Sequence, residues 1–359
     1  MQKRRRTKIV ALVLALLAAL PLPALAGCKS SRQGDGGQNE QTGPVAPAPI
    51  INPLTGKAVA SVDIIRRRPL AVKVENDPAA RPQSGLPVAD IVYEEIVEGG
   101  VTRFIALYLS QDVGVIGPCR SARQSDIDIA FFHLPLLACS GGAPGIMKRI
   151  QQAGMLGIEE DGIHFWRDKS RKAPHNLYTS TDRLRAALAS WQDDYNQLPP
   201  SSLTFMSEQD AAAAAASGSA GGEMGLAASS MDIVYGNGCD VHYDYAINGD
   251  GYLRAVNGHP STDLTTGAQL QPANVIVQYV EVVPSGLKDV LGADSPDSIV
   301  IGTGRAVIFS GGQAINATWS KTNRNTPTVY KDGNGDVVRL HPGQTWINLI
   351  PERIALNYQ

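Results

Sequence analysis

Short apolar runs separated by turn residues dominate the chain between residues 52 and 207. Residues 70–75, 102–109 and 134–140 have the composition of buried strands, and residues 88–97 favour a strand in their later part, with a helix as the alternative. Residues 121–132, 145–153 and 181–195 have helical patterns, the last capped by Ser180 or Thr181. Strands that alternate with helices predict an α/β (α+β) N-terminal domain over residues 52–207.

The second half of the chain has a different pattern. Residues 208–230 contain a run of alanines followed by Ser, Gly and Ala, which predicts a linker or surface insertion with a short helix as an option. From residue 231, β-rich runs at 275–283, 298–301, 305–309 and 345–350 are separated by Asn-Gly and Asp-Gly turn pairs. Residues 231–359 are therefore expected to form a mostly β C-terminal domain.

The N-terminus has the pattern of a secretory leader. Residues 3–8 are basic, residues 9–26 are apolar, and the stretch ends in Leu25-Ala-Gly-Cys28. This tetrapeptide resembles the lipobox of bacterial lipoproteins, which implies cleavage after residue 27 and acylation of Cys28. Residues 28–51 are rich in Ser, Gly and Pro and predict a tether. The alternative is an uncleaved membrane anchor, and both place the body outside the cytoplasm.

Charge and motifs exclude several classes of function. The 359 residues have 32 basic and 34 acidic side chains, and the acidic excess grows once the basic leader is set aside, so no nucleic-acid partner is expected. No Gly-rich phosphate loop, no Gly-x-Ser-x-Gly elbow and no cysteine pair with zinc-ligand spacing occurs. The sequence therefore predicts no cofactor and no metal.

Three polar clusters carry the candidate chemistry. They lie at residues 94–103, 119–123 and 166–176. Arginines three residues apart on a helix could present two guanidinium groups to one anion, and carboxylates beside a histidine could transfer protons. The acid/base candidates are Glu94, Glu98, Asp168 and His175, with Glu95 beside them, and the ligand-binding candidates are Arg103, Arg120, Arg123, Arg171 and Asn176. The alternative is a buried ion-pair network that ties loops to the sheet.

The body also has three cysteines. Cys119 and Cys139 are the pair that could form a disulfide outside the cytoplasm, because both fall in the first domain. Cys239 would then stay unpaired, and three buried thiols are the alternative.

Dense motifs in both halves of the chain support a family resemblance. They are Arg68–Asn76, Ala80–Leu86, Ala89–Glu94, Val97–Phe104, Ile116–Arg123, Arg167–Asp168, Ala173–Tyr178, Tyr252–Arg254, Asn274–Val277, Gly302–Gly304, Thr318–Lys321 and Pro342–Ile347. These motifs resemble the YerB-type bacterial lipoproteins, a family whose domains have no assigned function. The resemblance implies a secreted, two-domain lipoprotein and supplies no activity.

The leading hypothesis is a lipid-anchored protein on the outer face of the cell membrane that binds an anionic cell-wall polymer or an envelope protein partner. The arginines favour a phosphate or carboxylate ligand. The second hypothesis is an enzyme, a hydrolase of wall glycan or peptide that uses the Glu, Asp and His candidates. A solute-binding lipoprotein is the third and weaker alternative, because the second domain does not repeat the α/β pattern. The sequence leaves open whether the protein is an enzyme.

Overall fold

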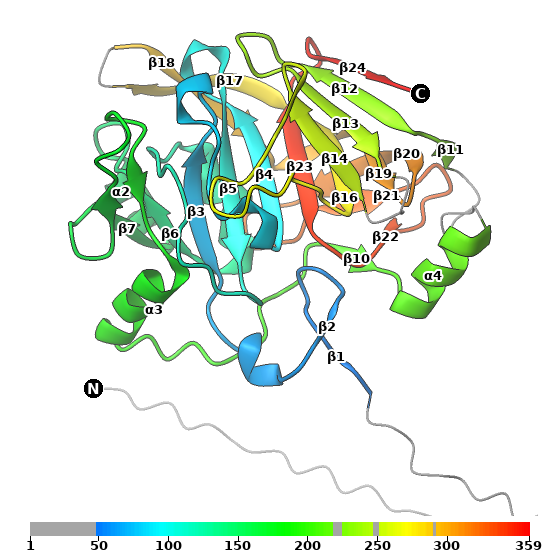
Figure 1. Ribbon diagram of the computed structural model, residues 1–359, viewed down its shortest axis with the longest axis horizontal. Coiled ribbons are helices and arrows are strands. Elements are labelled where there is room, and N and C mark those ends of the chain that lie inside the picture. The colour runs from blue at the N-terminus through cyan, green and yellow to red at the C-terminus, as the bar shows by residue number, and fades with distance from the viewer. Residues whose placement is uncertain (1–47, 218–224, 247–250, 290–291) are drawn as a thin grey trace, which may run out of the picture. The chain divides into compact units, whose positions relative to one another are not determined.

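A computed structural model describes residues 48–217, 225–246, 251–289 and 292–359, and its largest feature is a mixed sheet. Within these ranges the strand order is β11-β20-β19-β16-β23-β4-β5-β3-β6-β7, with β21 beside β20 (Figure 1). The first half supplies β3 (Leu70–Glu75), β4 (Ile91–Ile96), β5 (Thr102–Tyr108), β6 (Leu136–Cys139) and β7 (Leu156–Glu159). The second half supplies β11 (Leu226–Ala227), β16 (Asn274–Tyr279), β19 (Gly302–Ser310), β20 (Gln313–Lys321), β21 (Val329–Lys331) and β23 (Thr345–Ile350).

The two halves share this sheet through one pair of strands. β23 lies between β16 and β4 and is parallel to both. Every residue of β3, β4, β5, β16 and β23 is buried, as expected for strands covered on both faces. The observed architecture confirms an α/β first half and a mostly β second half. The domain boundaries drawn from composition remain predictions.

Most elements expected in the first half are present. Residues 88–97 form a strand rather than a helix, and helices occur at α2 (Ile146–Gln152) and α3 (Thr181–Ser190). Ser180 caps α3, because its side chain accepts a hydrogen bond from the backbone N–H of Arg183. The helix expected from residue 121 begins only at α1 (Ser125–Ala130). Residues 119–122 are instead held extended by single bridges from Cys119 to β3 and from Ala122 to Gly142.

A second sheet packs against the β-rich half of the first. Its order is β15-β14-β13-β12-β24, from β12 (Ser230–Val234), β13 (Val241–Tyr245), β14 (Tyr252–Val256), β15 (His259–Pro260) and β24 (Ala355–Tyr358). The core between the sheets includes Ile233, Tyr243, Val277 and Phe309. A separate antiparallel ribbon of β17 (Glu281–Lys288) and β18 (Asp294–Ile299) packs on β4 and α1.

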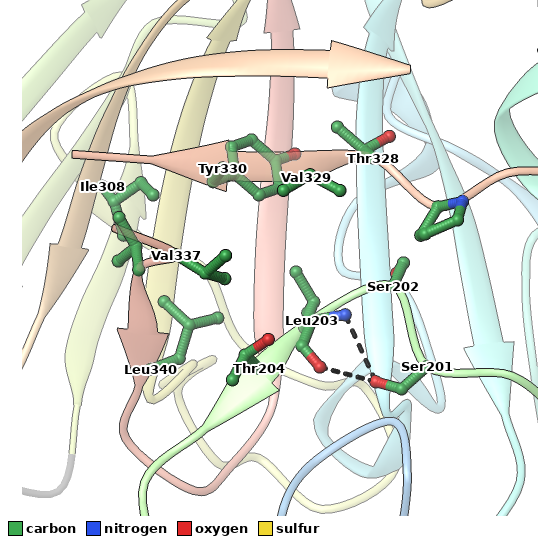
Figure 2. A pocket seen from close by; sticks show the side chains of 12 residues that line it. Ser201, Ser202, Leu203, Thr204, Ile308, Thr328, Val329, Tyr330, Val337 and Leu340 are labelled. Atoms are coloured by element: carbon green, nitrogen blue, oxygen red, sulfur yellow. Dashed lines mark hydrogen bonds between the residues drawn. The ribbon is translucent and has the colours of Figure 1, made fainter. Parts of the chain in front are cut away.

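The connection between the halves follows the surface of the second half. β10 (Thr204–Phe205) pairs in parallel with β22 (Arg339–Leu340), and α4 (Glu208–Ser217) follows it. A cavity of about 170 Å³ lies between β10, β21 and β22. Figure 2 shows Thr204, Tyr330 and Leu340 among the side chains that line it. No candidate site residue lines this cavity. The predicted linker therefore begins as a helix, and residues 218–224 lie outside the described residues.

The predicted leader, Cys28 and most of the tether also lie outside the described residues. The last two tether residues form β1 (Ile50–Ile51), which pairs with β2 (Ala58–Val59). Among the described helices, none has both the length and the apolar character that a membrane crossing requires.

All three cysteines of the body are buried thiols, so the disulfide between Cys119 and Cys139 that the sequence permitted is not formed. Burial raises the pKa of the Cys119 thiol, and it raises that of Cys139 to about 12. These thiols pack as small apolar side chains.

Candidate functional site

Several of the candidate residues lie at one edge of the main sheet, where the parallel strands β3, β6 and β7 end. Glu75 ends β3, and on the antiparallel neighbour β5 it lies opposite Arg103. The extended segment 119–123 crosses this edge, with Arg120 N–H bonded to the carbonyl of Lys73 and its own carbonyl bonded to Ser140 N–H. Ligands of open α/β sheets bind outside the carboxyl ends of parallel strands, so this is where the topology favours a site.

Arg103 and Arg123 meet at this edge. Their Nη1 atoms donate to the same acceptor, the carbonyl of Ser121, at 3.1 and 3.2 Å. Arg103 is 8% exposed, and among the described residues no carboxylate lies within ion-pair distance of it. Burial, together with the positive charges of Arg123 and Arg120, lowers the pKa of Arg103 to about 9, and the nearby carboxylates of Glu98 and Glu75 offset only part of this shift. Arg103 is thus a nearly buried cation whose closest charged neighbours include two other cations.

The more open side of the cluster is built on Glu75. Its two carboxylate oxygens lie 2.8 Å from Arg120 Nε and 2.9 Å from His175 Nδ1. Glu75 itself is buried, whereas the Arg120 and His175 side chains are 27% and 22% exposed. Glu75 therefore holds two solvent-facing donors beside Arg103. We call Arg103, Arg120, Arg123 and His175 the arginine edge.

Arg123 has a more structural place in this group. It forms an ion pair with Glu98 and also donates to the carbonyl of Ala122. Burial opposes ionisation of Glu98, but the hydrogen bond and charge of Arg123 lower the pKa of Glu98 below its usual value. The Glu98 carboxylate is therefore ionised and paired, which suits it to orient Arg123 rather than to donate a proton.

A second charged group lies deeper, and sequence reasoning missed two of its members. Lys73 contacts both Glu95 and Asp126, with Nζ 2.6 Å from Asp126 Oδ1, and Ser125 Oγ donates to Glu95 at 2.5 Å. All of these groups are fully buried. Burial and the charge of Glu95 raise the pKa of Asp126 to about 7. The one sign of this charged group in the sequence is a lysine, Lys73, inside the apolar run 70–75. The sequence does not show which residues pair with it, because Glu95 and Asp126 are distant in the chain.

Glu94 lies on the opposite face of the sheet from Glu95, as successive residues of a strand must. It is fully buried and pairs with Arg254 of β14, whose Nη2 lies 3.1 Å from Glu94 Oε2. It also accepts from Thr102 Oγ1 at 2.7 Å. Arg254 lies over the rings of Trp346 and Phe104, at 4.9 and 5.4 Å from their centroids. The structure therefore does not bring Glu94 to the arginine edge.

The remaining candidates form hydrogen bonds away from the arginine edge, Asp168 and Asn176 within their own loop and Arg171 mainly to other segments. Asp168 accepts from Ser170, and Asn176 Nδ2 donates to the carbonyl of Asp168 at 3.0 Å. Arg171 donates to the hydroxyl of Tyr178 at 2.8 Å and to backbone carbonyls of residues 79–82. Of this third cluster only His175 belongs to the arginine edge, through its contact with Glu75. Across the described ranges, no three His, Cys, Asp or Glu side chains gather into a group that could hold a metal ion.

Comparisons with known proteins support the family resemblance. Residues 54–193 match the "Protein of unknown function (DUF3048) N-terminal domain", and residues 231–347 match its C-terminal domain. A relative from Bacillus subtilis (strain 168), "Putative lipoprotein YerB", is 31% identical over 307 residues, which cover 84% of this chain and 86% of the relative. The crystal structure of YerB protein from Bacillus subtilis matches with a TM-score of 0.72 and 29% identity, over 86% of this chain and 99% of that one.

Proposed function

We propose, from the premise that the chain belongs to the DUF3048 family, that it is a lipid-anchored extracytoplasmic protein that binds an anionic polymer of the cell envelope at the arginine edge. The family has no assigned activity, so the ligand class is argued from the chemistry of this edge.

One observation carries the proposal. Arg103 is nearly buried beside two other arginines and forms no ion pair among the described residues, and the neighbouring Glu98 and Glu75 are paired with other cations. Burying a cation beside like charges costs free energy unless an anion balances it. A phosphate or carboxylate at this edge would supply that balance.

The neighbours of Arg103 suit such a ligand. Arg120 and His175 are partly exposed and already oriented by Glu75, so little side-chain entropy would be lost on binding. Guanidinium groups bind phosphate and carboxylate oxygens through paired N–H donors. A chain of phosphates or carboxylates would meet Arg120 first and Arg103 behind it.

The wall-hydrolase alternative has less support. Glu94 and Glu95 are fully buried and paired with cations, and Asp168 belongs to a separate loop. Glycan hydrolysis requires two carboxyl groups that flank the scissile bond and can reach the substrate. None of these three carboxylates meets that requirement.

Binding of full-length protein in detergent micelles to poly(glycerol phosphate) tests the proposal by calorimetry. We expect Arg103→Met and Arg120→Met each to weaken binding at least tenfold, and binding by the parent to weaken as salt rises. The exposed Arg66, remote in sequence from this edge, gives the control Arg66→Met, which should bind as the parent does.

Two outcomes would refute the anion site. One is that both variants melt like the parent and keep its affinity. The other is that the parent binds an envelope protein but no polyanion. Because Arg120 is partly exposed, Arg120→Met remains informative even if Arg103→Met fails to fold.

The lipid anchor is tested separately at Cys28, which lies outside the described residues. Two acyl chains hold a protein stably on a bilayer, at roughly 0.8 kcal/mol per buried CH₂. Cys28→Ala should release the body from the membrane or leave the leader uncut. Unchanged mass and membrane partition in this variant would contradict the anchor.

A further inference from the structure

A cavity of about 410 Å³ lies where the two family-matched regions meet, away from the arginine edge. Its walls come from Asn52, from residues within 55–64, 87–90 and 110–111 of the first region, and from residues within 269–273 and 344 of the second. Binding sites for small ligands commonly have this size and occur at such junctions. Both regions must be in place for the cavity to exist.

One wall follows the backbone of a strand edge. Ala58, Val59 and Ala60 line the cavity consecutively, and β2 pairs only with β1 in the described part of the chain. The second edge of β2 therefore has backbone N–H and C=O groups without a strand partner. An extended peptide can bind such an edge by adding a strand.

The polar groups of the walls divide into two kinds. Some are saturated: Asp90 accepts from Asn52 Nδ2 at 2.6 Å and from Ser110 Oγ at 2.7 Å, and the Gln344 amide donates to the carbonyls of Leu86 and Ala89. These groups fix the shape of the cavity.

Other polar groups are not saturated. Gln271 lines the cavity, and its Nε2 has no hydrogen-bond partner among the described residues, which is an unfavourable state. Lys57 and Gln111 are exposed at the rim. The cavity thus has one unpaired amide donor in its wall and, at its rim, a cation.

We infer that this cavity binds a short extended peptide of small, uncharged residues whose terminal carboxylate lies at Lys57. The inference is independent of the anion site. Small aliphatic side chains at Ala58, Ala89 and Ala273 leave room for residues the size of alanine. The lining has no aromatic ring on which a sugar could stack, so a peptide is favoured over a glycan.

Calorimetric titration of the full-length protein in detergent micelles with trialanine tests this inference. We expect the parent to bind trialanine and to bind its C-terminal amide at least fivefold more weakly. Lys57→Met should remove this difference between acid and amide, and Gln271→Leu should weaken both about tenfold. Lys148→Met and Gln152→Leu, both at exposed positions of α2, are the matched controls and should bind as the parent does.

A second variant keeps the test decisive if Gln271→Leu does not fold. Ala60 is exposed at the cavity wall, so Ala60→Arg should fill the entrance and abolish binding while the melting temperature is retained. The inference is overturned if the parent does not bind trialanine, if Ala60→Arg binds it normally, or if the parent binds diacetylchitobiose instead.

Discussion

Arg254 and Arg103 are both buried arginines on strands, yet their surroundings are opposite. Arg254 is 2% exposed and pairs with Glu94, and it lies over the ring of Trp346. Burial opposes its charge, but Glu94 raises the pKa of Arg254 above the usual value. Arg103 is 8% exposed, is bonded to a carbonyl and has its pKa lowered to about 9.

The difference shows that burial alone does not identify the role of an arginine. Arg254 has an anion supplied by the fold, and because it comes from the second half while Glu94 comes from the first, the pair links the halves. Arg103 forms no such ion pair among the described residues, because the neighbouring carboxylates of Glu98 and Glu75 are paired with Arg123 and Arg120. The ion pair of Arg254 therefore favours stability of the fold, whereas the guanidinium group of Arg103 remains able to bind an external anion.

Breaking the Arg254 pair should have the largest effect. Arg254→Met leaves the Glu94 carboxylate buried without its cation, so we expect the free energy of unfolding to decrease by about 3–5 kcal/mol. Urea denaturation followed by circular dichroism measures this change. The double variant Arg254→Met/Glu94→Gln should recover most of the loss. A double variant no more stable than the single one would show that the packing of Arg254, not its charge, stabilises the fold.

His133 extends the comparison to a buried basic group that forms no ion pair within the described part of the chain and that titrates between pH 3 and 6.5. Burial, with the positive charge of Lys321, lowers the pKa of His133 to about 3. Between pH 6.5 and 3 the unfolded state therefore binds more protons than the folded state. The contribution of His133 to the free energy of unfolding is complete above pH 6.5 and is lost as the pH falls. We expect about 2–3 kcal/mol to be lost between pH 7 and 4.5.

Denaturation of the parent and of His133→Gln at both pH values measures this contribution. The raised pKa of Asp126 changes stability in the opposite direction over the same range, but it acts on both proteins and cancels in their difference. Equal pH dependence in parent and variant would mean that His133 is protonated in the folded state.

Local patterns predicted much of the fold and only part of the site. The apolar runs gave β3, β5 and β6, because their residues are buried on both faces. The late start of α1 could not be predicted, because bridges from Cys119 and Ala122 to distant residues keep that segment extended.

The same limit applies to the charged groups. Period-2 alternation could have separated Glu94 from Glu95 once residues 91–96 were taken as a strand. Lys73 pairs with Glu95 and Asp126, and Arg254 pairs with Glu94. The paired residues are 22 to 160 positions apart in the sequence, so no local spacing predicts them.

Removing Arg103 should change stability far less than removing Arg254. Arg103→Met deletes a nearly buried cation that lies beside Arg120 and Arg123, so relief of repulsion offsets the lost packing. We expect the free energy of unfolding to stay within about 1 kcal/mol of the parent value at low salt. A loss of several kcal/mol in the same denaturation assay would mean that Arg103 has an anionic partner in the fold, and the contrast with Arg254 would fail.

The smallest effect is expected at an arginine that has a partner but lies in water. Arg167 Nη2 is 2.6 Å from Glu160 Oε2, and the two side chains are 41% and 34% exposed. Solvent and salt weaken such a pair, so Arg167→Ala should change the free energy of unfolding by about 0–1 kcal/mol. Denaturation at low and high salt measures this change, with Glu160→Gln as its matched control. Arg167 has the ion-pair partner that Arg103 lacks, and it has the solvent exposure that Arg254 lacks. A small effect here would show that neither an ion pair nor burial is sufficient alone for a large contribution to the free energy of unfolding. A loss as large as that of Arg254→Met would instead mean that pairing, wherever it occurs, determines the stability of this protein.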